Sequence, residues 1–256
     1  MELNKHAIEK SFEYLGLNVC GEKIVTPYYI NNIQLGLAGL MKESGVSDEV
    51  VKRVFQKYKD RQIPFGWYRG KGTPEEIEGA VIAISDKVGF SLMGATACGI
   101  LEFMKLYGLG VDCSGFVYNV LKHAFAKCLK GDLLGQSLDW CDENKTGVNY
   151  SGVYVFAGKA SGLVNYSEVR PLDLVLIKDG GGKYSHIGVF LLDGNKLRLF
   201  QSSIITNPTG VTATDYSFDR VGPVFGFVPA IGSKWENLYK GGGLEFRRLH
   251  VLAKVF

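Results

Sequence analysis

The stretch YGLGVDCSGFVYNVLKHAFAKCLK, residues 107–130, carries the strongest pattern in this 256-residue chain. From residue 112 onward its apolar residues recur at helical spacing and form one face. This face consists of Phe116, Val117, Val120, Leu121, Ala124, Phe125, Cys128 and Leu129. The opposite, polar face holds Asn119, Lys122, His123 and Lys130. Asp112 is a residue type that caps helix starts by accepting backbone N–H bonds. The pattern therefore predicts a helix that begins at Cys113.

Cys113 falls in the first turn of this helix, in phase with the buried face. The unpaired N–H groups and partial positive charge of a helix start favour a thiolate over a thiol. The same N–H groups can donate to an oxyanion. Gly115 is expected to leave room for a substrate, whereas the charge of Asp112 opposes thiolate formation. An ordinary buried cysteine fits this position equally well, so a catalytic interpretation requires a base elsewhere in the chain.

The first half of the chain has mainly helical patterns. Residues 73–76, Thr-Pro-Glu-Glu, supply a cap, a proline at the first helical position and an acid at the third. Helical spacing also predicts helices in residues 47–58 and from Ser91 to Tyr107. The stretch GWYRGKGT, residues 66–73, lacks the Ser or Thr that follows the lysine of a phosphate-binding loop. We interpret it as the entry to a helix.

The second half changes to short runs rich in β-branched and aromatic residues, separated by Gly, Asp and Asn. These runs are VYVFA (153–157), DLVLIK (173–178), SHIGVFLL (185–192), KLRLFQSS (196–203), VFGFVPA (224–230) and LEFRRLHVLAKVF (244–256). Helices first and strands later predict an α+β fold with an antiparallel sheet.

One of the four histidines is suited to act as a base. His6 belongs to a charged stretch and is expected to be solvated, and His123 lies on the polar face of the cysteine helix, pointing away from Cys113. His250 is flanked by apolar residues in a strand run, where a structural role is expected. His186 begins a strand that leads into a hairpin. By itself it could equally be a half-buried strand histidine.

The turn at residues 193–195, Asp-Gly-Asn, selects the partner of His186. Asp-Gly favours a two-residue type I′ turn. If these two residues are central, His186 lies directly opposite Gln201. The glutamine oxygen could then accept the Nδ1–H and leave Nε2 facing the sulfur, which is a nucleophile, base and orienter arrangement. A three-residue turn would select Ser202 instead, and a turn centred on the Gly-Asn pair would select Ser203.

The string VDCSGFV, followed by PLDLVLI and HIGVFL, resembles the NlpC-type cell-wall peptidases, a branch of the papain-like cysteine peptidases. The family's DCSG motif falls on residues 112–115 and its HxG motif on His186 and Gly188. The third polar residue of the family, on the next strand, corresponds to Gln201. The resemblance covers residues 107–203.

This resemblance implies a papain-like catalytic domain, residues 91–256, in which the helix carrying the nucleophile packs on an antiparallel sheet. Residues 1–90 are then a mainly helical N-terminal extension of unassigned role. An aromatic PYxWGG-like stretch precedes the cysteine in many members, but here that window reads CGILEFMKLYG. Tyr68 and Tyr107 are the candidates for the tyrosine that often assists in the family.

The predicted function is that of a cysteine hydrolase that cleaves an amide or peptide bond through a thioester. Cys113 is the expected nucleophile, His186 the general base and Gln201 the orienting residue, with no metal or organic cofactor required. The resemblance implies a peptidoglycan stem-peptide endopeptidase or amidase, whose partner is a peptide or peptidoglycan fragment. Two alternatives remain open: a papain-like acyltransferase, transglutaminase or protein deamidase using the same residues, and a non-catalytic binding module.

Composition and charge bear on the partners, the location and the cysteine chemistry that we expect for this protein. Lys and Arg total 29 against 26 acids, a net charge of +3, and they are scattered, which argues against nucleic acid as a partner. No apolar run is long enough to span a membrane. The first residues do not form a secretory signal, so we expect a cell-envelope or secreted location only if a leader precedes them, and otherwise the cytoplasm. Five cysteines without a CxxC pair argue against a disulfide framework and a zinc knuckle.

Overall fold

The computed structural model describes residues 2–29, 47, 49, 69–129, 132–206, 210–227 and 229–254. The α-helices within these ranges are α1 (Glu2–Leu15), α4 (Pro74–Val88), α5 (Ala97–Leu106), α6 (Cys113–Cys128), α7 (Leu133–Ser137) and α8 (Pro229–Lys240). The strands are β1 (Leu17–Val19), β2 (Glu22–Ile24), β3 (Ser161–Leu163), β4 (Leu174–Lys178), β5 (Tyr184–Asp193), β6 (Lys196–Ser203), β7 (Gly210–Phe218), β8 (Pro223–Phe225) and β9 (Leu244–Leu249). Apart from residues 47 and 49, the helix expected at 47–58 lies outside the described residues.

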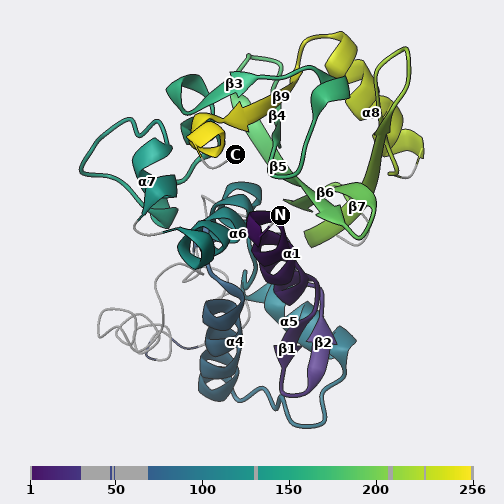
Figure 1. The fold of residues 1–256 in the computed structure, drawn as a ribbon. Helices are drawn as coiled ribbons and strands as arrows, with labels where there is room; N and C mark the ends of the chain where they lie inside the picture. The colour runs from purple at the N-terminus through teal and green to yellow at the C-terminus, as the bar shows by residue number, and fades with distance from the viewer. Residues whose placement is uncertain are drawn as a thin grey trace.

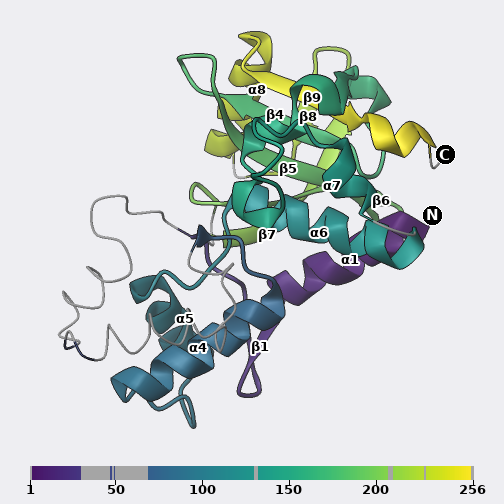
Figure 2. The ribbon, with the colours of Figure 1, turned by 90° about the vertical axis from the view of Figure 1, so that its left-hand side faces the viewer.

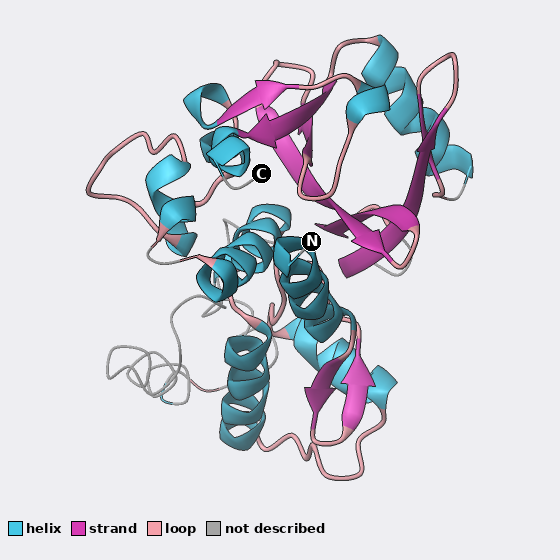
Figure 3. Ribbon diagram, in the orientation of Figure 1, coloured by secondary structure: helices cyan, strands magenta, loops and turns pink. Residues whose placement is uncertain are grey.

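The second half of the chain folds into a seven-stranded antiparallel sheet, with strand order β3-β9-β4-β5-β6-β7-β8 (Figures 1 and 3). Strands β1 and β2 form a separate hairpin. The sheet curls across the upper half of the molecule, and the helices from the first half of the chain lie below it (Figure 1). The α+β architecture expected from the sequence is therefore confirmed.

Helices cover both faces of the sheet. Helices α1 and α6 run side by side against one face, and α8 packs against the other (Figures 1 and 2). Three residues of α1, Leu3, Ala7 and Tyr14, are buried in the same apolar cluster as α6. The N-terminal helix thus belongs to the core that supports the cysteine helix.

The packing of α1 corrects the prediction for the polar face of α6. Asn119 is 6% exposed. Its Nδ2 donates to the Tyr14 hydroxyl at 3.0 Å and to the carbonyls of Lys71 and Gly72 at 3.0 and 3.2 Å. These bonds satisfy the amide without water, which is what allows a polar residue to be buried. The helical pattern could not reveal that a second helix covers this side.

The predicted helix after residue 73 is confirmed. Thr73 caps α4 in a capping box with Glu76: each side chain bonds the other's backbone N–H. Helix α5 begins at Ala97 rather than at Ser91, because the Thr96 hydroxyl accepts the N–H of Gly99 and caps the helix there. The predicted start was therefore too early.

Several strand predictions need correction. Val153–Phe156 forms a 3-10 helix, because an apolar run without clear alternation does not separate a strand from a buried turn. The run 224–230 divides between β8 and the start of α8, and the C-terminal run becomes a 3-10 helix, His250–Lys254, after β9. Strand β7 was not predicted; its residues are paired with β6 on one side and β8 on the other. The four runs that supply β4, β5, β6 and β9 are confirmed.

Candidate active site

The start of α6 lies where the sequence predicted it. The Asp112 carboxylate accepts the N–H of Gly115 at 2.6 Å, and Cys113 is the first helical residue. Cys113 is 4% exposed. The cap orients the first turn and leaves the sulfur beside the sheet rather than in solvent.

Strands β5 and β6 pair only near their turn. The ladder runs from Asp193 opposite Lys196 to Val189 opposite Phe200. Beyond this point β6 stays paired with β7 to its end. The two strands therefore separate before His186 is reached, which leaves the β5 backbone open on that side.

The residues at the start of α6 occupy this separation. The backbone N–H groups of Ile187 and Ser114 lie close enough to the Cys113 sulfur to lower the pKa of its thiol. On the other side, the Ser202 hydroxyl of β6 donates to the carbonyl of Val111 at 2.7 Å. Successive N–H groups of a strand point to opposite sides. The backbone N–H of Ile187 therefore points to the side on which β5 is no longer paired with β6. The thiol is thus held next to the strand that carries the predicted base.

The predicted contact between His186 and Gln201 is present, but it uses the other ring nitrogen. His186 Nε2 lies 2.5 Å from Gln201 Oε1. Because the amide oxygen accepts, Nε2 carries the proton and Nδ1 keeps its lone pair. The prediction that Nδ1 bonds the glutamine and Nε2 faces the sulfur is therefore wrong. Nδ1 is the nitrogen available as a base.

The hairpin register also differs from the prediction. The two central residues of the turn are Gly194 and Asn195, with φ of +61° at the glycine, as in a type II′ turn. This register, continued along β5, sets Gly188 rather than His186 opposite Gln201. The glutamine side chain instead reaches diagonally to His186, a distance that long side chains span. A Cβ on Gly188 would lie 3.3 Å from the Gln201 Cβ, so the missing side chain helps to clear this path.

The electrostatics of the site favour neutral groups. The pKa of the Cys113 thiol is raised to about 12, mainly by burial and secondly by the charge of Asp112, against the opposing effects of Lys71 and the backbone N–H groups. The expectation of a thiolate is therefore wrong for the free protein, because desolvation outweighs the helix start. Burial lowers the pKa of His186, although the bond from Gln201 and the charge of Asp112 oppose this shift. Within the described part of the chain, no hydrogen bond joins the thiol to the imidazole.

A buried lysine was not anticipated from the sequence. Lys71 is 7% exposed, and its ammonium lies 2.8 Å from the Asp112 carboxylate and 2.5 Å from the Ser114 hydroxyl. Within the GWYRGKGT stretch, the described residues 69–73 thus do more than lead into a helix. The Lys71 ammonium balances the negative charge of the Asp112 carboxylate beside the Cys113 thiol. In the sequence, this lysine stands between two glycines, a pattern that we compared only with phosphate-binding loops.

Gly115 serves this loop rather than a substrate. A Cβ at Gly115 would lie 2.3 Å from the carbonyl oxygen of Gly70 and 2.9 Å from the Lys71 side chain. The space that we expected to admit a substrate is therefore filled by backbone. The glycine is required for close approach of the loop to the helix.

Tyr28 is the tyrosine that the structure brings to the site. Its backbone pairs with Val111, and the pKa of its phenol is raised mainly by burial and further by the charges that Cys113 and Asp112 carry when ionised. The local sequence pattern does not single out this residue. Of the two predicted candidates, Tyr68 lies outside the described residues. Tyr107 is buried against Phe103, with ring centroids 4.8 Å apart.

Trp235 of α8 shields the imidazole from the other face of the sheet. Its ring meets His186 edge to face, with centroids 5.9 Å apart and planes at 77°. The indole is fully buried, and its position was not predicted because no helix was expected in residues 231–243. A buried aromatic neighbour lowers the local polarity, which agrees with the lowered pKa of His186.

Comparison with known proteins adds no relative. No protein-family model matches the chain, and a search of curated proteins finds no match. Among the residues that the structure describes, none of the helices has both the length and the apolar character needed to cross a bilayer.

Proposed function

We propose that this protein is a cysteine hydrolase that cleaves an amide or peptide bond through a thioester, with Cys113 as nucleophile, His186 as general base and Gln201 as its orienting partner. One observation carries the proposal: the backbone N–H of Ile187, the residue next to His186, acts on the thiol at the start of α6 and lowers its pKa. A nucleophile, a base and an orienter held in this order are the components of thiol acyl transfer.

The first step is attack with general-base assistance. Near neutral pH the thiol is protonated and the imidazole is uncharged, because burial shifts the pKa of each away from ionisation. His186 Nδ1 removes the thiol proton as sulfur attacks the carbonyl carbon. Catalytic hydrogen bonds are often long in a free enzyme and shorten when substrate binds. The backbone N–H of Cys113 donates to the oxyanion that forms.

The second step completes hydrolysis. The imidazolium returns its proton to the leaving nitrogen as the C–N bond breaks, which leaves a thioester on Cys113. His186 then takes a proton from water, the hydroxide oxygen attacks the thioester, and the thiolate recovers the proton. Gln201 holds the ring through Nε2 but carries no charge, so it stabilises the imidazolium less than a carboxylate would.

The substrate class that we propose is the stem peptide of peptidoglycan. The likeness of residues 107–203 to the NlpC-type peptidases supports this choice. The same thioester could pass its acyl group to an amine, or the enzyme could deamidate a protein glutamine, so the test must separate these products from those of hydrolysis. A binding module without catalysis would form none of them.

The test is digestion of purified muropeptides by the full-length protein, followed by mass spectrometry. We expect the wild type to release stem-peptide fragments with the mass gain of one water. Cys113→Ala and His186→Ala should abolish release while circular dichroism stays unchanged. Cys98→Ala, which alters an exposed cysteine outside the site, is the matched control and should keep full activity.

Other products would redirect the proposal. Aminolysis products alone would show acyl transfer and remove the hydrolase assignment. Deamidation products alone would show that the amide hydrolysed belongs to a glutamine side chain and would remove the stem peptide as substrate. Undiminished release by Cys113→Ala would overturn the catalytic role of the thiol itself.

A further inference from the structure

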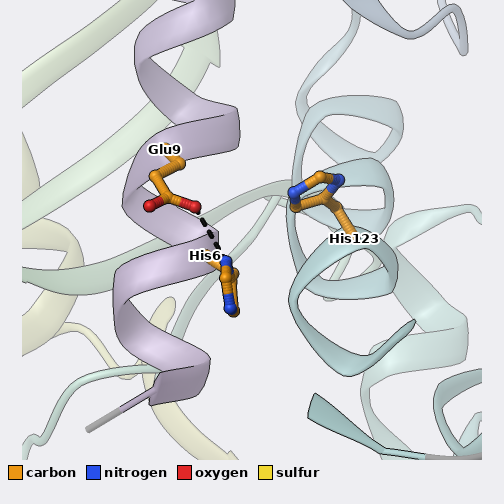
Figure 4. Close-up of side chains that lie close together, drawn as sticks. All are labelled: His6, Glu9 and His123. Carbon is orange, nitrogen blue, oxygen red and sulfur yellow. Dashed lines mark hydrogen bonds and ion pairs between the residues drawn. The ribbon is translucent and has the colours of Figure 1, made fainter. Parts of the chain in front are cut away.

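Two histidines that the sequence assigned to solvent and to a polar helix face meet between α1 and α6. His6 and His123 contact each other edge to face, with ring centroids 6.3 Å apart. Glu9, one turn after His6, bonds His6 Nδ1 through its carboxylate at 2.7 Å (Figure 4). One atom from each of the three side chains lies within 4.8 Å of the other two. Among the described residues, this is the only group of three such side chains.

We propose that His6, Glu9 and His123 form a binding site for Zn²⁺. Two imidazoles and one carboxylate are a ligand set that zinc accepts, with bonds of about 2.0–2.2 Å. Tetrahedral bonds of that length set neighbouring ligand atoms about 3.4 Å apart. The present spacing of up to 4.8 Å would have to close to that value when the ion binds. Ca²⁺ and Mg²⁺ prefer oxygen ligands, so two imidazoles disfavour them.

The position of the three residues suits an ion held between helices. His6 and Glu9 are three residues apart on α1, so they face the same direction. His123 comes from α6 and points toward them across the contact between the two helices (Figure 4). The site is at the surface: His6 and His123 are half-buried and Glu9 is exposed, so an ion can enter without local unfolding.

The charged side chains around these three residues are compatible with a bound cation. Lys10 acts on His123, but its ammonium is already paired with Glu13 and Glu75 at 2.5 and 2.6 Å. Glu2 lies 3.7 Å from His6 Nε2 and adds negative charge beside the group. The fourth ligand would be water or Glu2.

The proposed ion is structural rather than catalytic. His123 is ten residues after Cys113 on α6, which separates the two by about 15 Å along the helix. A bound ion would join α1 to the helix that carries the thiol. Since the folded chain alone presents the three ligands together, zinc should stabilise it by mass action.

The experiment uses the full-length protein and Zn²⁺ alone, with calorimetric titration and thermal unfolding in zinc and in EDTA. We expect one ion to bind per chain and to raise the melting temperature. His6→Asn, Glu9→Gln and His123→Asn should each weaken binding by about 10–100-fold or more, the loss known for even the outer partners of metal ligands. His250→Asn, which changes an exposed histidine outside the group, is the matched control.

A control background and one further measurement distinguish zinc at the proposed site from zinc bound elsewhere on the protein. Cys20, Cys98 and Cys141 are exposed thiols that can also take zinc, so all variants are compared in a background with serine at these positions. X-ray absorption of the zinc-loaded parent protein should show two imidazole ligands, whether or not a ligand variant folds well. Zinc without imidazole ligands, or binding unchanged in both histidine variants, would overturn the proposal.

Discussion

Burial has the largest effect on the pKa of the Cys113 thiol, and two charged neighbours of opposite sign also act on it. Asp112, which caps the helix, raises the pKa of the thiol, and Lys71, paired with that acid at 2.8 Å, lowers it. Burial acts in the same direction as Asp112 and is the larger cause. The cap that positions the sulfur thus also keeps it protonated. Attack therefore depends on the base removing a proton rather than on a thiolate formed beforehand.

The first prediction concerns the reactivity of this thiol toward iodoacetamide. With a pKa of about 12, the thiolate fraction grows tenfold per pH unit, so the labelling rate at Cys113 should rise tenfold per unit between about pH 7 and 9.5 without a plateau. Asp112→Asn removes a negative charge and should speed labelling at every pH. Lys71→Met removes a positive charge and should slow it. Peptide mass spectrometry of quenched samples measures the rates.

Cys98, which is exposed, serves as the internal control, because its labelling should be the same in all three proteins. Circular dichroism must verify each fold, since Lys71 and Asp112 form a partly buried pair. A Cys113 rate that stays constant across the pH range would mean that the thiolate is already formed, contrary to the raised pKa.

At the scale of elements, the start of α6 is positioned by contacts on three sides. The separation between β5 and β6 receives the thiol, the Ser202 hydroxyl bonds the chain just before the helix, and the Gly70–Lys71 loop lies against Gly115. The loop approaches so closely that no side chain fits between it and the helix. Helix propensity and packing therefore make opposite demands on residue 115.

The second prediction concerns the free energy of unfolding, on which helix propensity and packing at residue 115 have opposite effects. Gly115→Ala should lower the free energy of unfolding by about 1–3 kcal/mol, because a Cβ would lie 2.3 Å from the Gly70 oxygen. Gly79→Ala, in α4 with no atom within 4 Å of the added Cβ, should raise it by up to about 1 kcal/mol through helix propensity alone. Urea denaturation followed by circular dichroism measures both. Stabilisation by Gly115→Ala would show that the loop does not press on the helix.

At the scale of the molecule, the first helix and the cysteine helix share one core. Tyr14 of α1 is fully buried, donates to the carbonyl of Gly72 at 2.8 Å and accepts from Asn119 of α6 at 3.0 Å. Without α1, the side of α6 that carries Asn119 would lose its cover and one of its hydrogen-bond partners. The stability of the site thus depends on residues far from it in sequence.

The third prediction follows from this shared core. Removal of residues 1–16 should abolish cooperative thermal unfolding of the remaining chain, because it uncovers the apolar surface of α6. Tyr14→Phe removes two hydrogen bonds and should cost about 1–3 kcal/mol, at about 0.5–1.5 kcal/mol for each bond. Differential scanning calorimetry separates the two outcomes. A cooperative transition in a chain that begins at residue 91 would instead establish the first 90 residues as a dispensable extension.

Local patterns were sufficient for much of the fold. The start of α6 at Asp112, the capping box at Thr73 and the strands on either side of the 193–195 turn follow from bonds and alternation within a few residues. The partner of His186 was also predicted correctly, but for a wrong reason. The turn centred one residue later than expected, and the long side chain of Gln201 compensated for the change of register.

The sequence by itself determined which segments become helix or strand near the site and which side chains carry its chemistry, because these depend on neighbours in the chain. Only the tertiary structure decided which nitrogen of His186 is free, that Cys113 stays a thiol, that Asn119 is buried and that His6 meets His123. The physical reason is that pKa values, burial and ligand groups arise from distant segments coming together and excluding water, and no local pattern encodes that approach.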